Sequence, residues 1–214
     1  MDVAELRQAT VAERVALAAW LDTLDEGALA TPSLCAGWTV KEVAAHLAVA
    51  MSGGVPSFLR EIARHRGDAH AANRELARRR AERPWLEIVA TIRDRAGTRL
   101  TNPGTGPGGP FTDTLVHGGD MKHPLGVAHE PAGDRSLAAL RFLTGRRAVG
   151  FVSRGRLRGL RLVATDVEFA SGTGAEVTGR ASDLMMAAAG RAAVLPELSG
   201  PGVDVLRKRL TSSA

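Results

Sequence analysis

The spacing of apolar residues changes near Gly155, and this change limits the folds that the chain can adopt. Before it, apolar residues recur at helical spacing, first from Val3 to Leu24. After it, apolar residues between Leu157 and Phe169 alternate in short runs with Arg, Thr and Asp, which indicates strands. Helices followed by a small αβ region predict an α+β fold, with one domain at 1–150 and a second at 151–214.

Local signals place the expected helices and strands. Thr39-Val-Lys-Glu42 is a capping box that should start a helix near Val40, with Val43, Leu47 and Ala50 buried and His46 at the edge of that stripe. Further helices are expected through the Arg-rich region to Ala81 with a break near Gly67, from Trp85 to Leu100, from Phe111, from Ser136 to Val149, and from Ser182, as N-cap, to Arg191.

Glycine and proline mark the expected loops. The segment 102–110 is too rich in both residues to be predicted as helix, and it ends where the Phe111 helix should begin. Gly172-Thr-Gly174 resembles a hairpin turn between a strand that contains Val167 and Phe169 and a short strand at 176–179.

Composition bounds the compartment and the partners. The 214 residues include a single cysteine, Cys35, and no basic-then-apolar leader, so we expect a cytoplasmic protein. No apolar run approaches the roughly 20 residues that cross a bilayer. The net charge of +5 raises the question of nucleic acid, but acidic residues interrupt the densest basic stretch, Arg60 to Arg83. A solvated helix face is therefore favoured over a nucleic-acid surface.

Three residues have the composition of a catalytic metal site. Asp113 and His117 lie four apart, so they share one face of the helix that begins near Phe111, and His46 lies two turns into the Val40 helix. Two imidazoles and one carboxylate bind a divalent ion in many enzymes. Asp120 lies on the same arc as Asp113 and His117. The alternative is an exposed face on which His117 only hydrogen-bonds Asp113 or Asp120.

Residues near these three carry further signals. Gly118 and Gly119 indicate a close neighbour beside His117, either another helix or a ligand. Cys35 has no evident base, so a small buried thiol is favoured over a nucleophile. The remaining histidines lie in polar surroundings, and His123 alone is kept as a candidate for lining the site.

Three stretches carry a family resemblance. The segments 33–47 (SLCAGWTVKEVAAHL) and 113–126 (DTLVHGGDMKHPLG) resemble the mycothiol-dependent maleylpyruvate isomerase family, which belongs to the DinB-like superfamily. The segments 159–166 and 181–190 resemble that family's small C-terminal domain, which is similar to sterol carrier proteins. The match spans nearly the whole chain, and the first two motifs are specific as a pair.

The resemblance implies a fold, a cofactor and roles for residues. It implies an N-terminal four-helix bundle that holds a divalent ion, most often zinc, through His46, Asp113 and His117. The family often has Glu at the position of Asp113, which is one methylene shorter. The metal would bind the thiol of mycothiol and present a thiolate to a small electrophilic substrate. Asp120 would orient a histidine ligand or bind backbone groups.

Several functions remain open at this point. The first is a metal-dependent enzyme that uses mycothiol to isomerise a small electrophile or to transfer the thiol to it. A second is a binding or regulatory module with a degenerate metal site. A third, a non-haem Fe(II) oxygenase, is disfavoured because its facial triad is usually set on a β-scaffold. The protein is expected to be a monomer or a homodimer.

Overall fold

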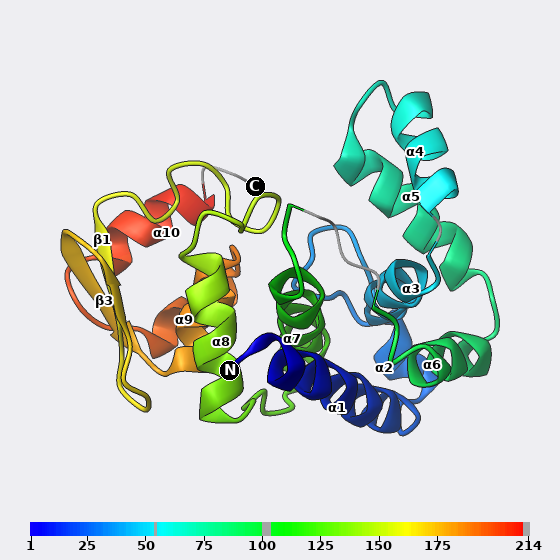
Figure 1. Ribbon diagram of the computed structural model, residues 1–214, viewed down its shortest axis with the longest axis horizontal. Coiled ribbons are helices and arrows are strands. Elements are labelled where there is room, and N and C mark those ends of the chain that lie inside the picture. Colours follow the sequence, from blue (N-terminus) through cyan, green and yellow to red (C-terminus); the bar gives the residue numbers. More distant parts are fainter. Residues whose placement is uncertain (54, 100–103, 212–214) are drawn as a thin grey trace. The chain divides into compact units, whose positions relative to one another are not determined.

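The computed structural model describes residues 1–53, 55–99 and 104–211 (Figure 1). Helices from α1 (Val3–Leu21) to α8 (Gly133–Leu143) precede a three-stranded sheet, so the predicted α+β class is confirmed. Contacts divide the chain into a helical unit, Arg7–Leu100 with Asp120–Val127, and a sheet unit, which holds the rest. The predicted domain boundary after residue 150 stays a prediction.

Helix α3 (Val40–Met51) forms the centre of the helical unit. Thr39 accepts a hydrogen bond from the backbone N–H of Glu42, and Glu42 accepts one from the backbone of Thr39, which confirms the capping box. Val43 and Leu47 are buried as predicted, but Ala50 is exposed. The expected stripe was wrong at Ala50 because α3 packs against both α5 and α6, so buried alanines replace a single apolar stripe.

The core of the helical unit gathers around α3. It contains residues of α1, of α6 (Trp85–Asp94) and of the last turn of α7 (Gly108–Lys122), among them Leu17, Leu21, Ile88, Ile92 and Met121. The short helix α2 (Glu26–Ala30) also packs on α3, and Asp25 caps it.

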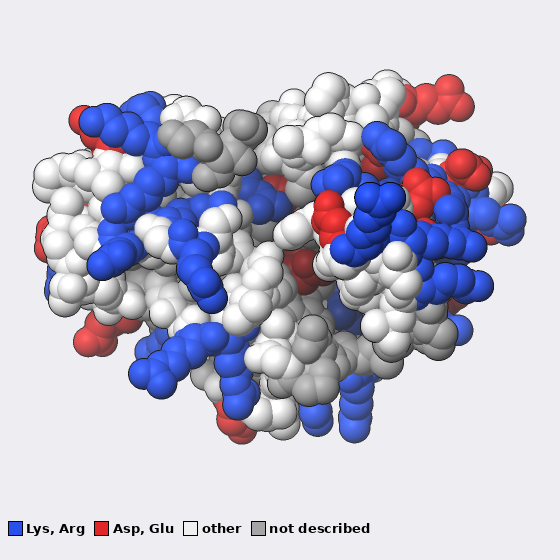
Figure 2. Space-filling model, turned by 90° about the horizontal axis from the view of Figure 1, so that it is seen from above, with Lys and Arg blue, Asp and Glu red and all other residues white. Residues whose placement is uncertain are grey.

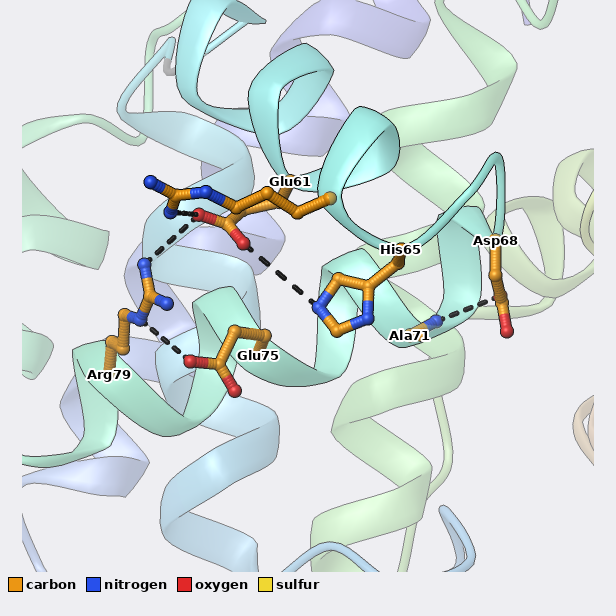
Figure 3. Close-up of polar contacts among 7 residues, drawn as sticks. Glu61, His65, Asp68, Ala71, Glu75 and Arg79 are labelled. Atoms are coloured by element: carbon orange, nitrogen blue, oxygen red, sulfur yellow. Dashed lines mark hydrogen bonds and ion pairs between the residues drawn. The ribbon is translucent and has the colours of Figure 1, made fainter.

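Helices α4 (Val55–Arg64) and α5 (Ala69–Ala81) form a hairpin whose surface mixes basic and acidic side chains (right side of Figure 2). The predicted break is confirmed: Gly67 has a φ of +94°, and Asp68 caps α5. Glu61 on α4 is buried and accepts hydrogen bonds from Arg64 and from Arg79 of α5 (Figure 3). Ion pairing between Glu61 and Arg79 therefore links the two helices.

Two predicted helices in this unit end early. Helix α1 stops at Leu21 rather than Leu24, and α6 stops at Asp94, whereas the predicted end, Leu100, lies outside the described residues. The buried Arg14 on α1 donates to the carbonyls of Ala96 and Thr98, at 3.0 and 3.2 Å. The two carbonyls, which lie beyond the end of α6, therefore accept hydrogen bonds from a side chain instead of from helix backbone.

The sheet has the order β2-β1-β3, with β1 (Leu160–Ala164) antiparallel to β2 (Ala170–Gly172) and parallel to β3 (Ala175–Gly179). The predicted hairpin at Gly172–Gly174 was wrong, because β2 and β3 flank β1 instead of pairing. A Cβ on Gly174 would lie 2.2 Å from the carbonyl oxygen of Gly159, so only glycine lets the chain pass this close. The predicted strand at Val167 and Phe169 is irregular, and β2 starts after it.

Helix α9 (Ala181–Ala188) packs against α8 and against β1 and β3. Its N-cap is Arg180, so the predicted cap at Ser182 was wrong; Ser182 is buried inside the first turn. Helix α8 spans 133–143 instead of 136–149, because the chain leaves the helix at Thr144 and Gly145. The unit continues through two helices that were not predicted, η2 (Ala192–Glu197) and α10 (Val203–Thr211).

None of the helices in the described part of the chain is both long and apolar enough to span a membrane.

Candidate metal centre

Helix α7 carries two of the predicted ligands. It starts at Gly108 and not near Phe111, because proline is tolerated in the first turn, where Pro110 lies. The loop predicted up to residue 110 was therefore too long. Most side chains between 111 and 120 are buried, and Asp113 and His117 are the partly exposed ones. Asp113 and His117, two residues of the predicted ionisable face, are thus more exposed than the other side chains of this part of the helix.

Asp113 and His117 lie next to each other as their spacing predicts. Oδ1 of Asp113 is 3.4 Å from Nε2 of His117. Two ligand atoms bound at about 2.0–2.1 Å to one tetrahedral ion are separated by about 3.3 Å. The pair therefore has the spacing of adjacent ligands in a zinc site, as well as that of an ion pair with a protonated histidine.

His46 lies on α3, in the helical unit, and is partly buried. Its ring lies against Trp38, with centroids 5.3 Å apart and ring planes inclined by 59°. The capping box fixes the start of α3 two residues after Trp38, so the turn that carries the indole leads directly into the helix that carries the imidazole. Trp38 thus limits the orientations that the His46 ring can take.

Asp120 is fully buried and receives a hydrogen bond from Cys35, whose Sγ lies 3.0 Å from Oδ2 of the carboxylate. The backbone carbonyl of Asp120 also accepts the N–H of Leu34, at 3.1 Å. The two roles predicted for Asp120, orienting a histidine ligand or binding backbone groups, stay predictions, because the partner shown for its carboxylate is the thiol of Cys35. The contact with Cys35 was not predicted, because no local pattern pairs residues 85 positions apart.

The hydrogen bonds around Ser33 shape the turn that carries Cys35. The hydroxyl of Ser33 accepts the N–H of Cys35 and donates to the carbonyl of Trp38. The N–H of Trp38 in turn donates to the carbonyl of Cys35. One compact turn therefore positions both the thiol beside Asp120 and the indole beside His46.

Gly119 of α7 has a defined neighbour. A Cβ on Gly119 would lie 2.7 Å from the Cε of Met186 on α9 and 2.8 Å from Cδ2 of His129. Of the two neighbours that the sequence left open for this position, a helix or a ligand, the structure has a helix. His123 is exposed at the start of η1 (His123–Leu125), and its part in lining a site stays a prediction.

The last turn of α7 carries a partly buried lysine, Lys122. Burial lowers the pKa of the Lys122 ammonium group, which lies 5.4 Å from the centre of the Trp20 ring. An ammonium over an indole face is stabilised by the ring's quadrupole. The last turn of α7 is thereby attached to α1 within the helical unit.

Comparison with known proteins decides the family. Residues 10–122 match the model of the mycothiol maleylpyruvate isomerase N-terminal domain, which covers more than half of the chain. The chain belongs to this family. The predicted resemblance is thus confirmed, and with it membership of a family of enzymes.

Solved structures support the mycothiol maleylpyruvate isomerase fold over 94% of the chain. A crystal structure of a histidine-to-alanine mutant of the mycothiol-dependent maleylpyruvate isomerase is similar with a TM-score of 0.60 and 16% identity, over 94% of this chain and 93% of that one. A second crystal structure of that isomerase gives 0.55 and 16% over the same shares. Among curated proteins no relative matches. The likeness of residues 151–214 to sterol carrier proteins stays a prediction.

Proposed function

We propose that the protein is a metal-dependent enzyme that uses mycothiol as a cofactor or co-substrate and acts on a small electrophile. The observation that carries the proposal is the Asp113–His117 pair, with its 3.4 Å separation, inside the segment that matches the family. His46 is proposed as the third ligand, and zinc as the metal. Membership of the family supports the use of mycothiol and an isomerase activity. The metal and its three ligands go beyond what the family supports and are part of the proposal.

The donor set fits the proposed ion. Imidazole nitrogen and carboxylate oxygen are ordinary zinc ligands, and three protein ligands leave a fourth position for a small molecule. When bound, zinc would lower the pKa of a coordinated thiol and so provide a thiolate at neutral pH. A helical scaffold for these ligands disfavours the oxygenase alternative.

The protein's own residues have three tasks in this proposal. Asp113 and His117 present their donor atoms from one rigid helix, which avoids the entropy cost of ordering a loop. Trp38 lies against the His46 ring and restricts its orientation. Asp120 fixes the turn that contains Cys35 and Trp38, through the bonds to Cys35 and Leu34.

The first experiment measures metal and thiol binding together. Purified protein is analysed for zinc and then heated with and without mycothiol, in the metal-loaded and the chelator-treated forms. We expect about one zinc per chain and a mycothiol-induced rise in Tm that requires the metal. A protein that takes up no zinc when the metal is in excess would overturn the metal site. A zinc protein without a thermal shift at millimolar mycothiol would overturn thiol dependence alone.

The second experiment separates isomerisation from thiol transfer. Maleylpyruvate, the compound named for the similar crystallised enzyme, is the first electrophile to test. An isomerase converts it without net loss of free thiol, whereas a transferase consumes one thiol for each substrate. If the metal-loaded protein with mycothiol neither isomerises maleylpyruvate nor consumes thiol, this compound is excluded as the substrate. Other electrophiles would then be tested by thiol consumption.

A further inference from the structure

A cavity lies within the sheet unit, apart from the residues of the proposed metal centre. It has a volume of about 590 Å³, which is in the range of small-molecule sites. Its walls come from the end of α8, the segment 148–158, and the first residues of β1 with the last of β2. The apolar part of the lining includes Leu143, Val149, Val152, Leu157, Leu160 and Leu162.

The same cavity is strongly basic. Arg146, Arg154 and Arg158 contribute to its lining, and none of the acidic residues in the described part of the chain does. Among the described residues, none of these three arginines forms an ion pair, whereas Arg161, Arg180 and Arg207 of the same unit do. Three unneutralised guanidinium groups beside an apolar wall attract an anion that also has an apolar part.

Two other arginines hold the basic wall in place. Arg156 donates to the carbonyl of Ala188 at 3.1 Å and to the hydroxyl of Ser153, a residue of the lining, at 2.9 Å. Arg209 on α10 donates to the carbonyls of Arg156 and Arg158, at 2.8 and 2.7 Å. The segment 153–158 is thus tied to α9 and α10, so that binding need not order this part of the wall.

The role of Arg156 is consistent with this anchoring. Burial, followed by repulsion from Arg191, lowers the pKa of its guanidinium group, which still remains charged at neutral pH. A Cβ on Gly190 would lie only 2.9 Å from Nη1 of Arg156. The glycine at this position therefore leaves room for the Arg156 side chain. Arg156 thus anchors the segment, and the side chains of Arg154 and Arg158 contribute to the lining of the cavity.

We propose that this cavity binds a small organic anion with an apolar body, such as an aromatic or short aliphatic carboxylate or sulfonate. An inorganic anion would leave the leucine and valine wall without contact. An uncharged apolar molecule would bring apolar surface close to three guanidinium groups without compensating them. The proposal concerns the sheet unit alone and does not depend on the metal centre.

The test uses 8-anilinonaphthalene-1-sulfonate, a fluorescent anion with an apolar body, on the full chain. We expect saturable binding to one site, displacement by 2-naphthoate, and much weaker displacement by the uncharged 2-naphthol. The double variant Arg154→Gln/Arg158→Gln should weaken binding about a hundredfold, because each of the two lost charge-assisted contacts contributes about a factor of ten. Val149→Asp should also weaken it, since this residue is 77% exposed and its replacement adds an acid to the lining.

A matched control removes the same charge elsewhere in the unit. Arg180→Gln/Arg207→Gln replaces two exposed arginines that do not line the cavity. It should change the Kd less than twofold at equal ionic strength. Equal weakening by both double variants would overturn the proposal, because net charge would then explain binding. Equal displacement by 2-naphthol and 2-naphthoate would overturn it too, as would the absence of saturable binding to the folded protein.

Discussion

The pattern acid-x-x-x-His occurs on three helices, α3 (Glu42 and His46), α4 and α7, and it serves different purposes on α4 and α7. On α4, Glu61 is 3% exposed and accepts hydrogen bonds from Arg64 and Arg79, whereas its oxygen lies 4.0 Å from His65. On α7, Asp113 and His117 are 23% and 13% exposed, and their donor atoms lie 3.4 Å apart. The first carboxylate neutralises arginines, and the second lies against a histidine.

The difference shows what spacing alone leaves undecided. Both pairs place an acid and a histidine on one helical face, as i and i+4. The environment then decides the role: two guanidinium groups compete for Glu61, and His65 is the peripheral member of that cluster (Figure 3). Near Asp113 the helix surface is mostly apolar or small, so the imidazole and the carboxylate are the groups that a cation would meet.

The sharpest test of this comparison is zinc binding by matched histidine variants. His117→Ala should weaken zinc binding at least about hundredfold, because loss of a direct ligand exceeds the 10–100-fold effect of losing a supporting residue. His65→Ala should leave the zinc affinity unchanged. Competition with a chromophoric chelator measures both. Equal loss in the two variants, or none in His117→Ala, would remove the distinction between the pairs.

The second test compares the stability of the metal-free protein after each acid is neutralised. Glu61→Gln leaves Arg64 and Arg79 facing each other without their carboxylate, so Tm should fall and amide exchange should increase across 58–81. Asp113→Asn should change Tm little, because its ion-pair partner His117 lies on the same helix. Thermal unfolding and hydrogen exchange measure these effects. A larger loss from Asp113→Asn would assign it the structural role instead.

A smaller effect is expected from the residue that orients His46. Trp38→Phe keeps an aromatic ring but loses part of the contact with the imidazole, and should weaken zinc binding about tenfold. Trp85→Phe, at the start of α6, is the control and should retain the affinity of the unaltered protein. If Trp38→Phe binds zinc normally while it remains folded, His46 needs no support from the indole.

The smallest expected effect is the response of the α4–α5 hairpin to acid. Burial by itself would raise the pKa of Glu61, but hydrogen bonds and charges from Arg64 and Arg79 outweigh it and hold this pKa below the usual 4.5. A lowered pKa in the folded state means that the contribution to stability is complete above pH 4.5 and is lost as pH falls through the lower value.

Amide exchange of α5 at a series of pH values, corrected for the intrinsic rate, measures this response. Protection should be constant from pH 7 to about 5 and decline below about 4.5. In Glu61→Gln the decline should be smaller, although Asp68, whose backbone bonds from Ala71 and His70 also lower its pKa, contributes to the remainder. The same decline in both proteins would mean that Glu61 is not its source.

The sequence allowed much of the helical unit to be predicted, because its signals are local. Thr39 and Glu42 are three residues apart and reach each other's backbone, and Gly67 breaks the helix through its own φ. The spacing of Asp113 and His117 likewise translates directly into contact. Such features need only the geometry of one helix or one turn.

The predictions that were wrong or missing concern features that depend on contacts between residues far apart in the sequence. The order β2-β1-β3 depends on which side of β1 each strand takes, and alternating residues do not encode that choice. Two hydrogen bonds, from Cys35 to Asp120 and from Arg14 to the carbonyl of Ala96, join residues more than 80 positions apart. Glu61 could have been recognised as a partner of Arg64 by its spacing, but its burial depends on Arg79 of the next helix.

The place of β1 between two later strands has a consequence for synthesis of the protein. β1 has neither neighbour when it leaves the ribosome, and it gains both within the next 15 residues, up to Gly179. All pairings in the sheet are therefore short in sequence, and short loops close fast. We expect the sheet to assemble as one local event, completed before α9 emerges to pack against it.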